Sequence, residues 1–171
     1  MSEAPQGSRL SYPPHDGLFY EDLAAGQVFQ SQGRTVTEAD LTIFSMLSGD
    51  WNPIHADAEF ALQTPYKQRL VHGVLGLAIV TGLMDQAGWF RQSAIAMLDI
   101  EKWQFAKPIL IGDTLTCLME ITSVRLTSKG NTGVVGRHFT LTNQHGETAQ
   151  AGDIGMLVRL RNTGAPEYVR R

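Results

Sequence analysis

The sequence predicts an α+β domain in which an antiparallel sheet wraps around one long helix. Residues 73–88 are apolar on nearly every side of a helical projection, which is typical of a buried helix. Four segments with strand-like alternation follow, at residues 94–105, 114–126, 132–142 and 148–161. Turn-like residues separate the last three segments, around Gly130 and at residues 144–146. Helix followed by strands, with no internal repeat, indicates a single α+β unit.

Length and composition fit one soluble domain. The chain has 171 residues, of which 43% are hydrophobic, and a formal net charge of −3, so nothing favours binding to nucleic acid or to an anionic membrane. There is no apolar signal core at the N-terminus and no membrane-length apolar run, so the expected location is the cytoplasm. The one cysteine, Cys117, lies in an apolar run and is expected to be buried. No Cys/His cluster has zinc spacing, so no metal is expected.

The N-terminal third is expected to alternate between irregular and regular segments. Residues 1–17 are polar and carry three prolines, which predicts an irregular arm and leaves residues 18–171 as the folded domain. Residues 28–36 alternate like a strand. A helix is predicted to begin after Thr37, which can cap it, and to end at Gly49. A short helix over residues 56–62 and a polar loop over residues 63–69 follow.

The segment 48–55 concentrates chemically active side chains. Asp50 and His55 are an acid/base pair by residue type. Pro53 fixes its own φ and pushes Asn52 toward an extended conformation, so we expect a stiff, irregular loop that aims two side chains at one point. Gly-Asp and Asn-Pro are also ordinary turn dipeptides, but a turn alone requires no imidazole.

Several strings in the sequence resemble the signature of the MaoC-like hydratases. They are Gly49-Asp50-x-Asn52-Pro53-Ile54-His55, followed six residues later by Ala61, then Val71-His72-Gly73, and finally Phe105-Ala106-Lys107-Pro108-Ile109-x-x-Gly112-Asp113-Thr114. The resemblance covers residues 28–159. It implies a hot-dog fold, the activity of an (R)-specific enoyl-CoA hydratase or dehydratase, an acyl-CoA substrate, and a homodimer or larger homo-oligomer.

The resemblance also implies roles for individual residues. Asp50 and His55 would activate a water molecule and pass a proton to the substrate. The N–H groups around His72 and Gly73, at the start of the buried helix, would hold the thioester oxygen as it becomes negative. The side chain of His72 is equally compatible with a purely structural role.

Further candidates are expected to support the pair or to contact the substrate. Asn52 would orient Asp50 or its loop, and Thr81 stands where the family has a serine that helps to position the base. Trp51 is expected either to line the acyl pocket or to pack in the core. Candidate contacts for the phosphates of coenzyme A are Tyr66, Lys67, Arg69, Lys107 and Arg125, although loop cations are more often simply solvated. The pocket wall is expected to include Leu77, Val80 and Met97.

The sequence therefore predicts reversible addition of water to the double bond of a trans-2-enoyl-CoA-type thioester, which gives a 3-hydroxyacyl thioester. Coenzyme A is part of the substrate, and no separate cofactor is expected. A hot-dog acyl-CoA thioesterase and a non-catalytic acyl-CoA-binding protein are the alternatives. The first would place its acid on the central helix, where Asp85 near the far end is the only acidic residue. The intact pair of Asp50 and His55 argues against the second.

Overall fold

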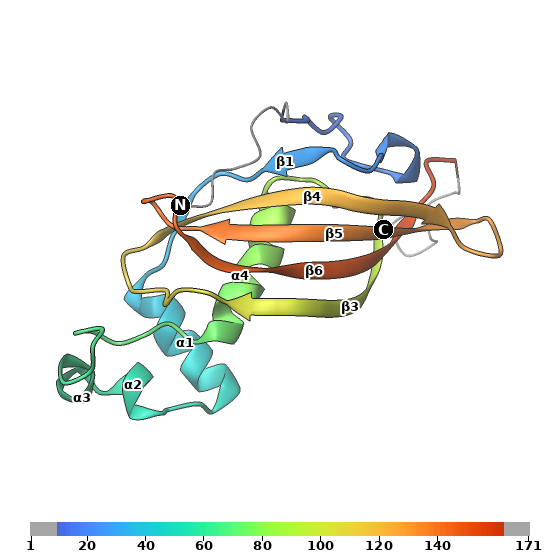
Figure 1. The fold of residues 1–171 in the computed structure, drawn as a ribbon. Coiled ribbons are helices and arrows are strands. Elements are labelled where there is room, and N and C mark those ends of the chain that lie inside the picture. The colour runs from blue at the N-terminus through green and yellow to red at the C-terminus, as the bar shows by residue number, and fades with distance from the viewer. Residues whose placement is uncertain (1–9, 163–171) are drawn as a thin grey trace.

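Helix α4, Gly73–Gln86, lies across one face of an antiparallel sheet (Figure 1). The computed structural model describes residues 10–162 of the chain. The strands are β1 Val28–Gln30, β2 Arg34–Thr35, β3 Ala94–Phe105, β4 Thr114–Leu126, β5 Thr132–Thr142 and β6 Thr148–Arg159. The helical segments before α4 are η1 Tyr20–Asp22, α1 Glu38–Ser48, α2 Pro53–Ala56 and α3 Ala58–Leu62.

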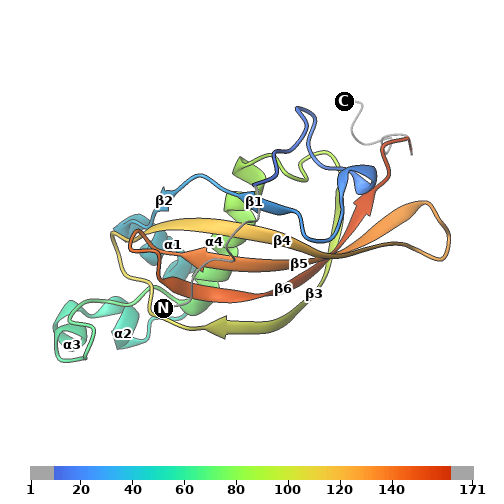
Figure 2. The same cartoon turned by 45° about the horizontal axis from the view of Figure 1, so that its top comes forward.

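The sheet has the order β1-β4-β5-β6-β3, and β2 also pairs with β4. Alternate side chains of β4, β5 and β6 are buried, as expected for strands with one face on a core. On that face Met119, Phe139 and Ile154 form a cluster with Ile79 and Leu83 of α4. Figure 2 shows α2 and α3 beyond one end of the sheet, away from this cluster. The predicted α+β class is confirmed.

The bounds of the long strands follow the sequence pattern closely. Strands β3, β4 and β5 begin and end at the predicted residues. Strand β6 ends at Arg159 and not at the predicted residue 161. The N–H of Arg161 instead donates to the carboxylate of Glu21 at 2.9 Å, so this end of the chain leaves the sheet.

The predicted strand over residues 28–36 is interrupted, because β1 and β2 are separate. Ser31 lies between them, and its N–H donates to the Cys117 carbonyl at 2.9 Å. The Cys117 N–H donates in return to the hydroxyl of Ser31 at 2.9 Å, in place of a backbone carbonyl. A side chain that takes over a backbone hydrogen bond breaks the regular ladder. Cys117 itself is buried, as predicted.

Helix α4 is not enclosed on every side, which corrects the prediction from its composition. Leu75, Ile79 and Leu83 are buried against the sheet, whereas Val74 on the other side is 59% exposed. The helix is apolar on nearly every side, but among residues 10–162 only one side is buried. None of the described helices combines the length and the apolar character needed to cross a membrane.

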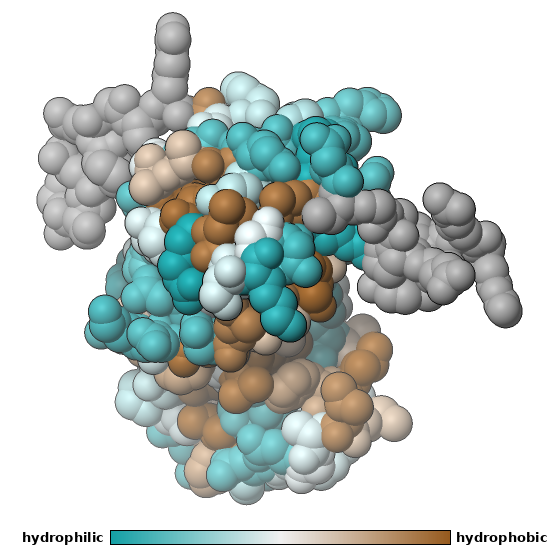
Figure 3. Space-filling view, turned by 90° about the vertical axis from the view of Figure 1, so that its right-hand side faces the viewer, coloured by the Kyte–Doolittle hydropathy of each residue, from teal (hydrophilic) through white to brown (hydrophobic). Residues whose placement is uncertain are grey.

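Strand β3 lies at the edge of the sheet and is exposed along almost its whole length. Its exposed hydrophobic side chains include Ile95, Met97, Leu98 and Ile100, and α1 exposes Ile43, Met46 and Leu47. On the face shown in Figure 3, hydrophobic groups reach the surface in patches between hydrophilic ones. The outer edge of β3 has no strand beside it among the described residues.

The described part of the predicted arm, residues 10–17, contains one isolated bridge between Leu10 and Val28. Leu18, where the folded domain was predicted to begin, is 2% exposed, and its N–H donates to the Trp89 carbonyl at 2.7 Å. The division of the chain at residue 17 stays a prediction, and residues 1–9 lie outside the described part.

Candidate active site

Asp50 follows directly after the C-terminus of α1. Thr37 caps the other end of this helix as predicted, because its hydroxyl accepts a hydrogen bond from the Asp40 N–H at 3.4 Å. Gly49 has a φ of 75° and closes the helix by donating its N–H to the Ser45 carbonyl at 2.9 Å. This left-handed conformation favours glycine. The turn at Gly49 therefore fixes where the chain carrying Asp50 leaves α1.

His55 is carried by α2, a single helical turn, and this corrects the prediction of an irregular loop through residue 55. Pro53 is the first residue of α2, a position that suits proline because no N–H donor is needed there. The side chain of Asn52 caps the turn by accepting the Ile54 N–H at 3.1 Å. Only the stretch from Asp50 to Asn52 is irregular.

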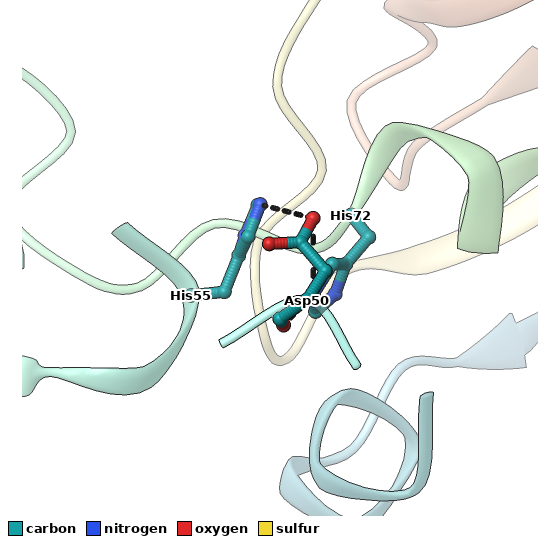
Figure 4. Close-up of side chains that lie close together, drawn as sticks. All are labelled: Asp50, His55 and His72. Carbon is teal, nitrogen blue, oxygen red and sulfur yellow. Dashed lines mark hydrogen bonds and ion pairs between the residues drawn. The ribbon is translucent and has the colours of Figure 1, made fainter. Parts of the chain in front are cut away.

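The carboxylate of Asp50 lies beside the Nε2 atoms of two imidazole rings, those of His55 and His72 (Figure 4). Its Oδ2 is 3.9 Å from His55 Nε2 and 4.0 Å from His72 Nε2. Its Oδ1 accepts the N–H of Asn52 at 3.2 Å, so Asn52 orients the acid through its backbone. The side chain of Asp50 is 52% exposed, whereas that of His72 is 3% exposed. The site is therefore open on the side of the carboxylate and closed behind His72.

Backbone carbonyls fix the hydrogens on both imidazole rings. His55 Nδ1 lies 2.8 Å from the Leu70 carbonyl, so it carries a hydrogen, since a carbonyl only accepts. His72 Nε2 lies 3.0 Å from the Asp50 carbonyl and carries a hydrogen for the same reason. His72 Nδ1 is buried without a partner among the described residues. In the neutral form of the ring, Nε2 of His55 is therefore the acceptor, and it faces Asp50.

Two acceptors therefore face each other across the site, Asp50 Oδ2 and His55 Nε2 at 3.9 Å. This distance is too long for a direct hydrogen bond, and an ionised carboxylate has no hydrogen to donate. A water molecule has two O–H groups and satisfies both acceptors at once. The arrangement is suited to taking a proton from such a water.

The start of α4 lies next to this pair. Neither Gly73 nor Val74 has a hydrogen-bond acceptor for its N–H within residues 10–162, as is normal for the first turn of a helix. A pocket of about 330 Å³ opens beside these groups, and His55, Gly73, Phe105 and Gln150 are among its lining residues. The positive end of the helix thus reaches, at Gly73, a space that a substrate can enter.

The predicted supporting residues divide into two groups. Asn52, His72 and Gly73 lie with Asp50 and His55, whereas the hydroxyl of Thr81 donates to the Ala78 carbonyl of its own helix at 2.7 Å. The supporting role of Thr81 stays a prediction, since no described contact joins it to the pair.

The predicted substrate contacts are similarly divided. Tyr66 and Lys107 line the pocket. Lys67 Nζ donates to the Leu62 carbonyl at 3.2 Å, and Arg69 forms an ion pair with Glu38. Trp51 is 53% exposed, so packing in the core of this chain is excluded. Arg125 is exposed on β4 and does not line the pocket.

The wall of the pocket differs from the sequence-based expectation. Val80 is buried in the core, and neither Leu77 nor Met97 lines the pocket. Phe105 and Gln150 line it instead. Phe105 is the first residue of the third string that resembles the family, so the sequence contained a signal that could have placed it at the pocket. Nothing in the sequence marks Gln150, which is one polar residue in a strand.

Three donor atoms of Asp50, His55 and His72 lie within 4.8 Å of one another, close enough to share a metal ion. The Nε2 of His72 is occupied by its hydrogen bond to the Asp50 carbonyl. Two free donors remain, fewer than the three protein ligands of a typical catalytic zinc site. The donor set therefore suits a water molecule better than a metal.

Comparison with known proteins gives consistent matches. The profile of the MaoC like domain matches residues 22–143. The (R)-specific enoyl-CoA hydratase of Rhodospirillum rubrum is 30% identical over 106 residues, which cover 62% of this chain and 71% of that protein. The beta-methylmalyl-CoA dehydratase of Chloroflexus aurantiacus is 28% identical over 158 residues, which cover 92% of this chain but only 44% of that protein.

The fold also matches a solved structure. A Mycobacterium tuberculosis protein described as having a double hotdog fold superposes with a TM-score of 0.75 over 88% of this chain and 47% of that chain. The sequence identity is 20%, so this likeness concerns the fold alone. The chain spans about half the length of this protein and of the Chloroflexus aurantiacus relative. Since the family profile covers more than half of its residues, the chain belongs to the MaoC-like family and has its hot-dog fold.

Proposed function

We propose that this protein is a hydratase or dehydratase that adds water reversibly to the double bond of a trans-2-enoyl-CoA-type thioester. The observation that carries the proposal is the pair of acceptors, Asp50 Oδ2 and His55 Nε2, 3.9 Å apart beside the free N–H groups of α4. The names of the two relatives support it, because a hydratase and a dehydratase catalyse the two directions of one reaction type.

In the proposed complex, the thioester oxygen lies at the first turn of α4. The N–H groups of Gly73 and Val74 donate to it and stabilise the negative charge that builds up during the reaction. Gly73 has no side chain, so the thioester can approach the backbone closely. The acyl group occupies the pocket beside Phe105.

A water molecule donates one hydrogen to the carboxylate of Asp50 and the other to Nε2 of His55. As its oxygen bonds to C3, one water proton passes to the pair and the electrons of the double bond move toward the thioester oxygen. The pair then delivers a proton to C2. One hydrogen and one hydroxyl are added, and both side chains return to their starting states. Dehydration follows the same steps in reverse.

The thioesterase alternative has less support from the geometry. Asp85 is the only acidic residue of α4, lies in its last turn and pairs with Arg91 at 3.4 Å. It is therefore at the opposite end of the helix from the free N–H groups.

The test is an assay with a panel of trans-2-enoyl-CoA esters that includes linear, methyl-branched and carboxylated acyl groups. The absorbance of the conjugated thioester reports hydration, and a thiol reagent reports release of coenzyme A. We expect loss of the conjugated absorbance, formation of the 3-hydroxyacyl ester and no thiol release. Thiol release at a comparable rate would instead support a thioesterase. Binding without either reaction would support the non-catalytic alternative.

We also propose that two copies of this chain pair along the open edge of β3. The hydrophobic side chains Ile95, Met97 and Ile100 on this strand are 43–47% exposed, which is typical of an interaction surface. The double hotdog relative supports a two-unit arrangement, since this chain corresponds to about half of it. Light scattering after gel filtration should give twice the mass of one chain. The Met97→Lys variant should instead have the mass of a single chain.

A further inference from the structure

Gln150 is a buried polar residue that connects the pocket with the sheet. It lies on β6, is 1% exposed and lines the pocket. Its Nε2 donates to the Gly73 carbonyl at 2.9 Å, and its Oε1 accepts the indole N–H of Trp103 at 3.1 Å. An indole N–H only donates and a carbonyl only accepts, so the orientation of the amide is fixed at both ends.

Two glycines, Gly76 and Gly152, leave room for the side chains of Gln150 and Trp103. A Cβ added at Gly76 would lie 2.2 Å from Gln150 Nε2. A Cβ added at Gly152 would lie 2.6 Å from Trp103 Cε3. Burying an amide is costly unless its hydrogen bonds are made. Here both polar atoms of the Gln150 side chain have partners, so the interior is built to hold this side chain in one position.

The contact with Gly73 acts on the end of α4 that faces the pocket. The Gly73 carbonyl belongs to the same peptide unit as the N–H of Val74. A hydrogen bond to the carbonyl fixes the plane of that peptide unit and polarises it, which makes its N–H a stronger donor. This N–H has no acceptor among residues 10–162.

We propose that Gln150, anchored by Trp103, is a positioning residue that aims the free N–H groups of α4 at the thioester oxygen; this inference rests on the proposed function. Gln150 does not contact Asp50 or His55 among the described hydrogen bonds. It reaches α4 from β6, whereas the acid/base pair is carried by the chain around α1 and α2. Gln150 therefore acts on stabilisation of the oxygen and leaves activation of the water unchanged.

The test compares Gln150→Met, which keeps the length of the side chain and removes both hydrogen bonds, with Trp103→Phe, which removes only the anchor. Hydration of the enoyl-CoA panel by the wild-type chain is measured first, and the absence of hydration with every ester would overturn the proposed function itself; the ester that reacts fastest is then used for the variants. We expect kcat to fall about 10- to 100-fold in Gln150→Met, less than the loss on removing an oxyanion donor outright. Trp103→Phe should cause a smaller loss. KM and the pH profile should stay close to wild type, because the acid/base pair is untouched.

A second readout is the absorbance of bound 2,4-hexadienoyl-CoA in an Asp50→Asn background, in which turnover is suppressed. Polarisation of the thioester carbonyl shifts this absorbance to the red, and Gln150→Met should reduce the shift. Gln86→Met, at the exposed far end of α4, is the control and should change neither readout. A lower melting temperature with unchanged kcat and unchanged red shift would overturn the inference. If Gln150→Met does not fold, kcat and the red shift of Trp103→Phe test the inference in its place.

Discussion

The imidazole rings of His55 and His72 stack, with centroids 3.8 Å apart and planes 24° from parallel. The ring of His72 also lies 5.0 Å from the ring of Phe44, which helps to close it off from solvent. Its Nε2 holds the Asp50 carbonyl at 3.0 Å. One buried ring therefore supports both members of the acid/base pair, His55 through its face and Asp50 through the backbone.

Replacing His72 should separate these two contacts. His72→Gln keeps an N–H donor for the Asp50 carbonyl but loses the stacked ring, and we expect kcat to fall about 10-fold, which corresponds to about 1.4 kcal/mol. His72→Ala removes both contacts and should cost about 100-fold or more. Initial rates at saturating substrate measure both. His138→Gln is the control, because His138 pairs with Asp153 and does not line the pocket; an equal loss in this variant would contradict a specific role for His72.

Asp50→Asn should lower kcat by about 100- to 10,000-fold, because the amide cannot accept the proton of the water. The affinity for an unreactive substrate analogue should change little, which calorimetry can measure. Asp57→Asn is a matched control: Asp57 caps α3 by accepting the Phe60 N–H at 3.0 Å, and asparagine caps equally well. Wild-type activity in Asp50→Asn would exclude the role proposed for this carboxylate.

Gly73→Ala should impair the site without unfolding the protein. A Cβ at this position would lie 2.9 Å from Cε1 of Phe105, so this ring, which lines the pocket, must shift. We expect a lower kcat/KM, by about 10-fold or more, and partial rescue when Phe105→Leu is added. Gly82→Ala is the control on the same helix, where a Cβ has no neighbour within 4 Å. It should raise the free energy of unfolding by up to about 1 kcal/mol, as alanine is the better helix former.

Burial raises the pKa of the Cys117 thiol from 9.0 to about 12, against the opposing effect of the Arg137 guanidinium. A thiol with a raised pKa keeps its proton in the folded state, while the unfolded chain releases it above pH 9.0. The thiol's contribution to stability is therefore complete below pH 9.0 and is lost as the pH rises toward about 12.

Two measurements check this prediction. A thiol reagent should label Cys117 only as fast as the protein unfolds, because the native thiol is 0% exposed. In urea unfolding, the free energy of unfolding should be lower above pH 9.0 than below it, and this difference should be smaller in Cys117→Ala than in the wild type. Rapid labelling of the folded protein at neutral pH would contradict the burial of this side chain.

The long strands could be predicted from the sequence because their signals are local. Alternating side chains and turn residues set the bounds of β3, β4 and β5 without reference to distant residues. The break at Ser31 could not be predicted, because it depends on a hydrogen bond to Cys117, 86 positions further along the chain. The open side of α4 could not be predicted either, since composition shows what a helix can bury but not how many partners it has.

The acid/base pair was similarly accessible, because Asp50 and His55 are five positions apart and Pro53 restricts the chain between them. The stacking of His55 on His72 depends on the loop that returns to α4. The contact between Gln150 and Gly73 joins residues 77 positions apart. The sequence therefore singled out Asp50, His55 and His72, which the structure brings together, whereas it gave no signal for Gln150.

Strand β3 carries Trp103, which anchors Gln150, and Phe105, which lines the pocket, and its outer edge pairs with no other strand in residues 10–162. If two copies pair along this strand as proposed, the same strand would connect the pairing surface to the pocket and would couple the proposed activity to self-association. Dilution would then lower the activity, and the specific activity would rise with protein concentration until every chain is paired along β3. Such an enzyme would be switched on by abundance alone, without any effector molecule.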